Sequence, residues 1–166
     1  MKKVFLGGTC NGSLWRDDVI KKLKIYYYNP VGDEWTPEMM EEELRQRAES
    51  DFCLYVLTPK MNGFYSVAEV VDDSNKRPAK TVFCFIKNDE ENTFSEVQVR
   101  SLEQIRKMVK GNGATCFDTL NEVIDFLNHQ YHQICLHYLN ASTRKRRKRY
   151  FHWMAEASAE HSLSAI

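Results

Sequence analysis

The strongest constraint on the fold of this chain is a regular alternation of short apolar runs with longer amphipathic stretches. The clearest run is Phe52–Leu57, which is continuous, apolar and bounded by turn-forming residues, as in a buried strand. The pattern predicts five strands, over residues 3–6, 24–28, 51–57, 81–86 and 114–117. It predicts five helices between and after them, over residues 14–23, 37–49, 65–74, 95–110 and 120–139.

This order of elements defines a fold class. Strands that alternate with helices through short loops pair in parallel, and right-handed crossovers place helices on both faces of the sheet. We therefore expect an α/β domain, a flavodoxin- or Rossmann-like doubly wound sheet of five parallel strands, over residues 1–140. Ser13 is expected to cap the first helix, and Thr36 to cap the second, which begins with Pro37.

Charge separates the end of the chain from its body. The 166 residues carry 23 basic and 23 acidic side chains, but six of the basic ones are consecutive, in Arg144–Arg149. Residues 141–166 are therefore interpreted as a basic and aromatic tail on a mildly acidic domain. No apolar run is long enough to span a bilayer, so we expect no membrane partner and a cytoplasmic location.

The cysteines and histidines point away from metal and triad chemistry. The five cysteines are scattered, and none has the C-x-x-C spacing of a zinc or redox site. All five histidines follow residue 128, far from the expected ends of the strands. We expect no metal and no cofactor, and any catalysis should depend on carboxylates.

The strand-end rule for open α/β sheets selects candidate site residues. Ligands bind at the carboxyl ends of the strands, near the point where the strand order reverses. Candidates for substrate binding after the first three strands are Gly7, Gly8, Thr9, Ser13, Trp15, Arg16, Asn29, Trp35, Asn62, Gly63 and Ser66. The glycine loop offers N–H groups for a phosphate or a sugar hydroxyl, but it is also an ordinary strand-to-helix turn. Arg16 is either an anion clamp or a surface ion-pair residue, and the tryptophans could instead pack in the core.

Glu69 is the leading catalytic candidate. It lies in the first turns of a predicted helix, among Val67, Ala68 and Val70. Apolar surroundings raise the pKa of a carboxyl group, and such an acid near a strand end is typical of a covalent or acid–base catalyst. The alternative is an acid that only favours the helix N-terminus. Asp33, in the loop after the second strand, is a candidate supporting acid.

A set of segments resembles the nucleoside 2-deoxyribosyltransferase-like family. The segments are Phe5–Thr9, Ser13–Arg16, Tyr28–Trp35, Glu49–Pro59 and Gly63–Val71, and the similarity extends over roughly residues 3–130. The resemblance implies a flavodoxin-like sheet, assembly into a homo-oligomer, and a nucleoside or nucleotide substrate. It also implies that an N-glycosidic bond is cleaved and that the deoxyribosyl group passes to another base or to water.

The same resemblance assigns roles to single residues. Glu69 matches the family's nucleophile, and Asp51 matches an aspartate that helps to hold the base. Transferases of this family usually carry another aspartate shortly before the nucleophile, where this chain has Asn62 and Gly63. The mechanism would follow that of a retaining glycosidase, with one carboxylate attacking the anomeric carbon.

The sequence is compatible with three other functions. The first is a glycosidase acting on NAD or a related nucleotide, and the second is a module that binds nucleotides without turnover. The third concerns Arg144–Arg149 and the aromatic residues that follow, which could bind nucleic acid through phosphates and stacked bases. A solvated tail, or one that docks on an acidic surface of a neighbouring subunit, is the alternative for that segment.

Overall fold

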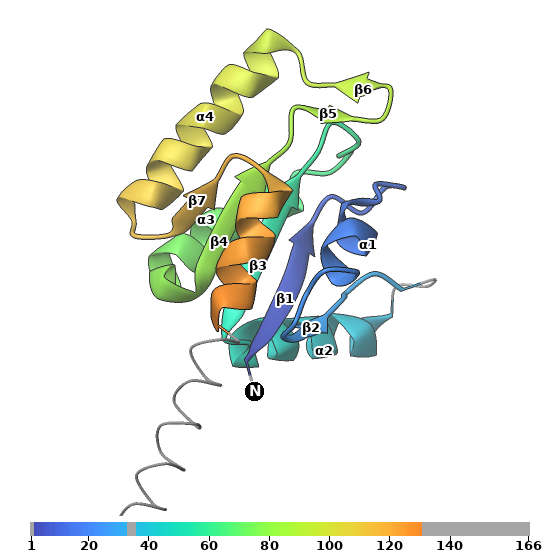
Figure 1. The fold of residues 1–166 in the computed structure, drawn as a ribbon, viewed down its shortest axis with the longest axis vertical. Coiled ribbons are helices and arrows are strands. Elements are labelled where there is room, and N and C mark those ends of the chain that lie inside the picture. The colour runs from blue at the N-terminus through green and yellow to red at the C-terminus, as the bar shows by residue number, and fades with distance from the viewer. Residues whose placement is uncertain (1, 33–35, 131–166) are drawn as a thin grey trace, which may run out of the picture. The chain divides into compact units, whose positions relative to one another are not determined.

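The computed structural model describes residues 2–32 and 36–130, which form an α/β domain built on a parallel sheet (Figure 1). Its strands are β1 (Lys3–Gly8), β2 (Tyr26–Tyr28), β3 (Phe52–Leu57), β4 (Thr81–Phe85) and β7 (Thr115–Phe117). They pair in parallel in the order β2-β1-β3-β4-β7. The predicted doubly wound, flavodoxin-like class is confirmed.

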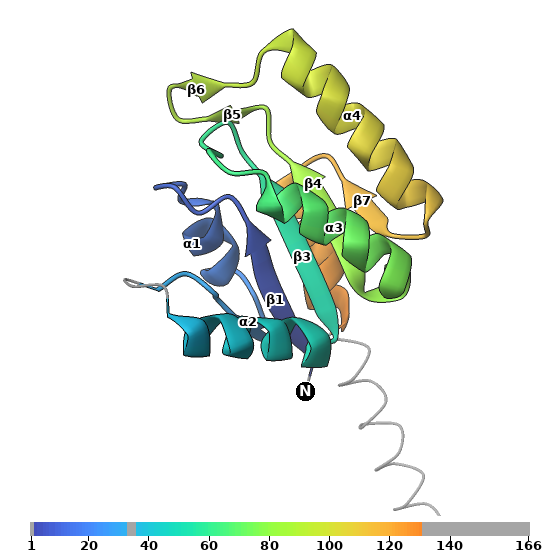
Figure 2. The ribbon, with the colours of Figure 1, turned by 180° about the vertical axis from the view of Figure 1, so that it is seen from behind.

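Helices cover both faces of the sheet. The helices are α1 (Trp15–Ile20), α2 (Pro37–Glu49), α3 (Tyr65–Lys76) and α4 (Glu96–Gly111), with a short 3-10 helix, η1 (Pro78–Lys80), and helical residues 120–130. Residues 120–130 cross the face seen in Figure 1, and α3 crosses the opposite face seen in Figure 2. Hydrogen bonds from Lys22 and Lys24, which follow α1, join this segment to residues 120–130, and a hydrogen bond from Arg47 to Asp73 joins α2 to α3.

The buried strands explain why this chain adopts a two-sided sheet. Every residue of β3 and of β4 is buried, as expected for central parallel strands covered on both faces. On the α3 side, Phe5, Tyr55 and Phe83 pack with Val70 of α3 and Leu102 of α4. Apolar burial of this extent is the main stabilising contribution to such a domain.

Two of the predicted helix starts have different outcomes. Thr36 caps α2 as predicted, because its side chain accepts a hydrogen bond from the Met39 N–H and Pro37 follows it. The prediction for Ser13 is wrong, since Leu14 occupies the N-cap of α1 and makes no side-chain cap. The Ser13 hydroxyl instead donates to Asp89, a residue distant in sequence.

A small hairpin on the loop after β4 was not predicted. Residues 87–93 were expected to form a polar loop, but they contain a small antiparallel hairpin of β5 (Asn88–Asp89) and β6 (Asn92–Thr93). Glu90 in its turn has a left-handed backbone with φ of 53°. Two-residue strands without apolar alternation give no periodic pattern to detect.

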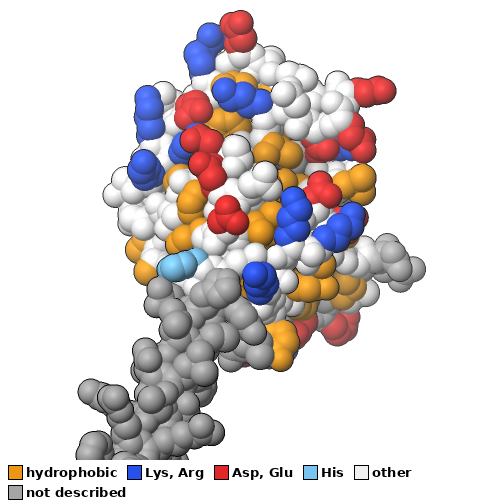
Figure 3. Space-filling model, viewed as in Figure 1, with side chains coloured by type: hydrophobic (Ala, Val, Ile, Leu, Met, Phe, Trp, Pro, Cys, Tyr) orange, Lys and Arg blue, Asp and Glu red, His pale blue; other side chains and the backbone are white. Residues whose placement is uncertain are grey.

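No helix in the described ranges 2–32 and 36–130 is both long and apolar enough to cross a membrane. Acidic and basic side chains lie side by side across the face in Figure 3 and do not gather by sign. The basic run Arg144–Arg149 lies outside the described residues.

Candidate active site

The strand order reverses between β1 and β3, and the loops after these strands meet there. The Thr9 N–H donates to Val56 O at 2.9 Å, and the Thr58 N–H donates to the Thr9 hydroxyl at 2.9 Å. Gly8 has φ of 120°, and a Cβ at this position would lie 2.1 Å from Val56 O. Glycine is required here because β1 approaches the backbone of β3 too closely for a side chain.

A cleft opens beside this junction. Its volume is about 310 Å³, near the lower end of the range for ligand pockets. Residues from β1, α1, α2, α3 and the loops after β1 and β2 line it: Gly7, Gly8, Cys10, Arg16, Pro30, Val31, Gly32, Glu43, Tyr65, Ser66 and Glu69. The location is the one that the strand-end rule selects.

Two hollows adjoin the cleft. The smaller, about 150 Å³, shares Gly8, Cys10, Tyr65 and Ser66 with it and adds residues that include Thr9, Asn62 and Gly63. The other, about 400 Å³, is lined by Met40, Glu43, Leu44, Tyr65 and Glu69. The cleft therefore joins a polar glycine-rich region to an apolar region, with Glu69 bordering the apolar one.

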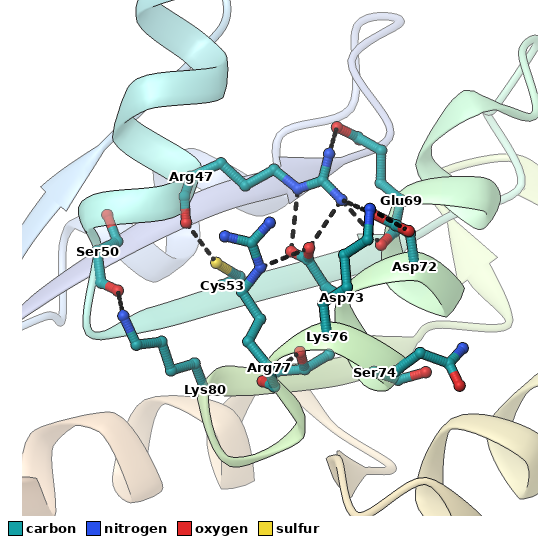
Figure 4. Close-up of polar contacts among 12 residues, drawn as sticks. Arg47, Ser50, Cys53, Glu69, Asp72, Asp73, Ser74, Lys76, Arg77 and Lys80 are labelled. Atoms are coloured by element: carbon teal, nitrogen blue, oxygen red, sulfur yellow. Dashed lines mark hydrogen bonds and ion pairs between the residues drawn. The ribbon is translucent and has the colours of Figure 1, made fainter.

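Glu69 is a buried carboxylate in the wall of this cleft. Only 6% of its surface is exposed, and Arg47 Nη1 donates to its Oε1 at 3.2 Å (Figure 4). Burial raises the pKa of Glu69 to about 7, against the opposing charge of Arg47 and with support from the negative charges of Glu43 and Asp73. Both forms of this acid are therefore present near neutral pH.

Glu43 is a second carboxylate in the cleft, and the sequence analysis missed it. Burial raises its pKa, and the charges of Arg47 and Arg16 oppose that shift. It lies on the same face of α2 as Met40 and Arg47, three and four residues away, and it lines the apolar hollow together with Met40 and Leu44. No local signal in the sequence separates Glu43 from the other charged residues of α2.

Arg16 is buried, and its donors point back into the protein. Nε, Nη1 and Nη2 donate to the carbonyl oxygens of Leu6, Thr9 and Gly8 at 3.0, 2.6 and 3.2 Å. Burial lowers its pKa. The Trp15 indole, only 2% exposed, also donates to Thr9 O. The hydrogen bonds from these two buried side chains therefore fix the backbone conformation of the glycine loop.

The remaining predicted residues lie around or away from the cleft. Asn29 precedes Pro30, which lines the cleft, and its side-chain oxygen accepts a hydrogen bond from the Val31 N–H. The Ser13 hydroxyl donates to Asp89. Asp51 is at the amino end of β3, roughly 20 Å from the carboxyl end at about 3.3 Å per residue. Its carboxylate accepts from Lys2 Nζ and the Lys3 N–H. Asp33 and Trp35 lie outside the described residues.

A flavodoxin-like sheet with a buried carboxylate, Glu69, and a half-buried one, Glu43, beside a glycine-rich switch point places this chain among the α/β proteins whose ligand sites lie at the carboxyl ends of the strands. The family model described as nucleoside 2-deoxyribosyltransferase like matches residues 1–88. This match covers more than half of the chain, so the protein belongs to that family, as the sequence analysis suggested. No curated protein and no solved structure gives a significant match.

Proposed function

We propose that this protein cleaves the N-glycosidic bond of a deoxynucleoside or deoxynucleotide and passes the deoxyribosyl group to a base or to water. The observation that carries the proposal is Glu69, a carboxylate with a pKa near 7 in the wall of a cleft at the switch point. Membership of the family supports a nucleoside substrate.

The first step uses Glu69 as the nucleophile. A carboxylate oxygen bonds to the anomeric carbon, and the bond to the base breaks with its electron pair leaving on nitrogen. Glu43, whose pKa burial raises, gives its proton to that nitrogen. Asp33 remains a second candidate for this proton donor.

The second step releases the sugar. A free base or a water molecule bonds to the anomeric carbon, its proton passes to the Glu43 carboxylate, and Glu69 leaves as a carboxylate. The glycine loop, Ser66 and Asn62 are proposed to hold the sugar or a phosphate, since their backbone and side-chain groups line the polar end of the cleft.

The test is release of free base, separated by chromatography, from each deoxynucleoside and its 5′-monophosphate. We expect Glu69→Gln to lose almost all release, and Glu43→Gln to lower the rate by about 10²–10⁴-fold. Glu96→Gln is the matched control, because the Glu96 side chain is 94% exposed on α4. After rapid quenching, mass spectrometry should find a deoxyribosyl adduct on the peptide containing Glu69.

Other outcomes separate the alternatives. Equal release by wild type and Glu69→Gln on every substrate would exclude Glu69 as the nucleophile. Nicotinamide release from NAD would identify the NAD-type glycosidase, and calorimetric binding of a nucleotide without product would identify a binding module. Sedimentation of the same samples would test the proposed homo-oligomer.

A further inference from the structure

A buried ionic cluster lies directly behind Glu69, between α2 and α3 (Figure 4). Its centre is Arg47, whose side chain is 6% exposed. Nη1 of Arg47 donates to Glu69 Oε1 at 3.2 Å, and Nη2 donates to the Glu69 backbone oxygen at 3.2 Å. One guanidinium thus contacts both the carboxylate and the backbone of the proposed nucleophile.

Asp73 fixes Arg47 from the other side. The fully buried Asp73 carboxylate accepts from Arg47 Nε at 3.0 Å and from Nη2 at 2.8 Å. Paired contacts of this kind fix the plane of a guanidinium as well as its position. The orientation of the Nη1 donor toward Glu69 is therefore set by Asp73.

Two further groups hold Asp73. The Tyr55 hydroxyl donates to Oδ2 at 2.6 Å, and Arg77 Nε donates to Oδ1 at 2.8 Å. Burial alone would raise the pKa of Asp73, but the hydrogen bonds from Arg47 and Tyr55 and the charges of Arg47 and Arg77 hold it low. Asp73 therefore stays ionised, and it has a cationic partner even without Arg47.

The contact with Glu69 is one-sided. In the described part of the chain, the hydrogen bonds of the Glu69 carboxylate involve Oε1 alone. Oε2 is therefore the oxygen left for an incoming anomeric carbon in the cleft that Glu69 lines. A fixed carboxylate with one unengaged oxygen is the geometry that nucleophilic attack requires.

We propose that Arg47, held by Asp73, is the positioning residue of this enzyme: it fixes Oε1 of Glu69, presents Oε2 for attack and stabilises the carboxylate that departs in the second step. This inference rests on the proposed function. Attack converts Glu69 into a neutral ester and release restores its charge, so a fixed cation favours the release step.

Several charged or titratable groups surround Glu69. Arg47 and Glu43 lie on α2, Asp72 and Asp73 on α3, Tyr55 on β3, and Arg16 and Cys10 follow β1. Arg47 favours the ionised form of Glu69, whereas Glu43 and Asp73 favour the protonated form. Removal of Arg47 should therefore raise the midpoint of the Glu69 titration, and removal of the Asp73 charge should lower it.

The experiment titrates Glu69 by following the ¹³C resonance of its carboxyl carbon as a function of pH, with the resonance assigned by its absence in Glu69→Gln. The values of kcat and KM for base release are measured on the same variants. We expect Arg47→Gln to raise the titration midpoint and Asp73→Asn to lower it, while each lowers kcat by about a hundredfold with KM less affected. Arg47→Lys keeps the positive charge but lacks the paired donors of the planar guanidinium. The titration midpoint of Glu69 in this variant should therefore stay near that of wild type, while kcat falls. Arg45→Gln is the matched control, because Arg45 is exposed on α2 and pairs with Glu42 and Glu49.

General disruption of the fold would move the two midpoints in the same direction, which would overturn the proposal. An unchanged midpoint in Arg47→Gln would overturn it as well, and so would wild-type kcat in both Arg47 variants. If wild type releases no base from any substrate, the proposed function fails, and the titrations still decide whether Arg47 controls the ionisation of Glu69.

Discussion

Glu69 is subject to two opposing influences. Burial favours its protonated form, whereas Arg47 favours the carboxylate that attack requires, and the pKa settles near 7. The rate of base release should therefore increase between pH 6 and pH 8, as the carboxylate fraction of Glu69 increases.

Ionisation of a buried acid also lowers stability. The folded-state pKa of Glu69 is raised from 4.5 to about 7, so the folded protein holds this proton more tightly than the unfolded chain does. Wild type should therefore lose more stability than Glu69→Gln as the pH rises through this range. We expect the stability of Glu69→Gln relative to wild type to rise by about 2 kcal/mol between pH 5 and pH 8.

Urea unfolding of both proteins at the two pH values measures this difference. Constant effects of the substitution, such as a changed contact with Arg47, cancel in the comparison between pH values. A difference that is the same at pH 5 and pH 8, or smaller at pH 8, would contradict a raised pKa.

At the level of residues, the sequence predicted Glu69 but not its partners. Glu69 could be predicted because an acid among valines, close after a buried strand, departs from the ordinary pattern. Glu43 and Arg47 could not be distinguished from the other charged residues of α2, because burial depends on the neighbouring helix α3. Arg16 was predicted to be an anion clamp or a surface ion-pair residue, but it is buried and its donors bind carbonyl oxygens of β1 and the loop after it, a contact that no local pattern indicates.

At the level of elements, Lys60 connects three segments at the carboxyl edge of the sheet. It follows β3, and its Nζ donates to Gly12 O at 3.1 Å and to Glu90 Oε2 at 2.6 Å in the turn between β5 and β6. Asp89 in β5 also accepts a hydrogen bond from the Ser13 hydroxyl. The hairpin is therefore joined to the β1–α1 loop directly through Ser13 and indirectly through Lys60. These contacts restrain the loops beside the cleft.

We expect Lys60→Ala to accelerate amide hydrogen exchange in residues 10–13 and 88–93, with little change in the strands, because it releases loops and not the core. Exchange followed by mass spectrometry measures the effect. Lys76→Ala is the control, since Lys76 is an exposed residue that pairs with Asp72 on its own helix. Unchanged exchange in both loops would show that Lys60 does not restrain them.

The hairpin and the helices differ in how well the sequence predicts them. Thr36 followed by Pro37 marks the start of α2, and Ser95 with Gln98 forms a capping box that begins α4. Ser13 has the same chemistry as these caps, but Asp89 competes for its hydroxyl. A contact between residues 76 positions apart cannot be inferred from local pattern.

At the scale of the whole molecule, the core of the described residues is contained in one compact unit. The buried apolar residues of the described part run from Val4 to Leu127, and residues 1–130 form one compact unit. The doubly wound class could be predicted because alternating strands and helices, joined by right-handed crossovers, allow few strand orders. The family match covers β1 and β3, the two strands that form the switch point. The division at residues 140 and 141 stays a prediction.

Deletion of residues 141–166 should leave the melting temperature within a few degrees of that of the full chain, because these residues lie beyond the described core. Calorimetry measures this effect, and fluorescence anisotropy with DNA and RNA at several salt concentrations measures binding. If Arg144–Arg149 bind nucleic acid, the deletion should remove a salt-dependent affinity. Equal affinity in the two proteins would exclude that function.

The pairing of Arg47 with Asp73 also has an evolutionary consequence. A relative that replaces Asp73 with an apolar residue leaves the Arg47 cation poorly compensated, and a relative that replaces Arg47 weakens the hold on Glu69. Substitutions at these two positions should therefore occur together across the family. Relatives that retain Glu69 but have lost both residues would have to orient the nucleophile by different means, and the pair would divide the family into two lineages.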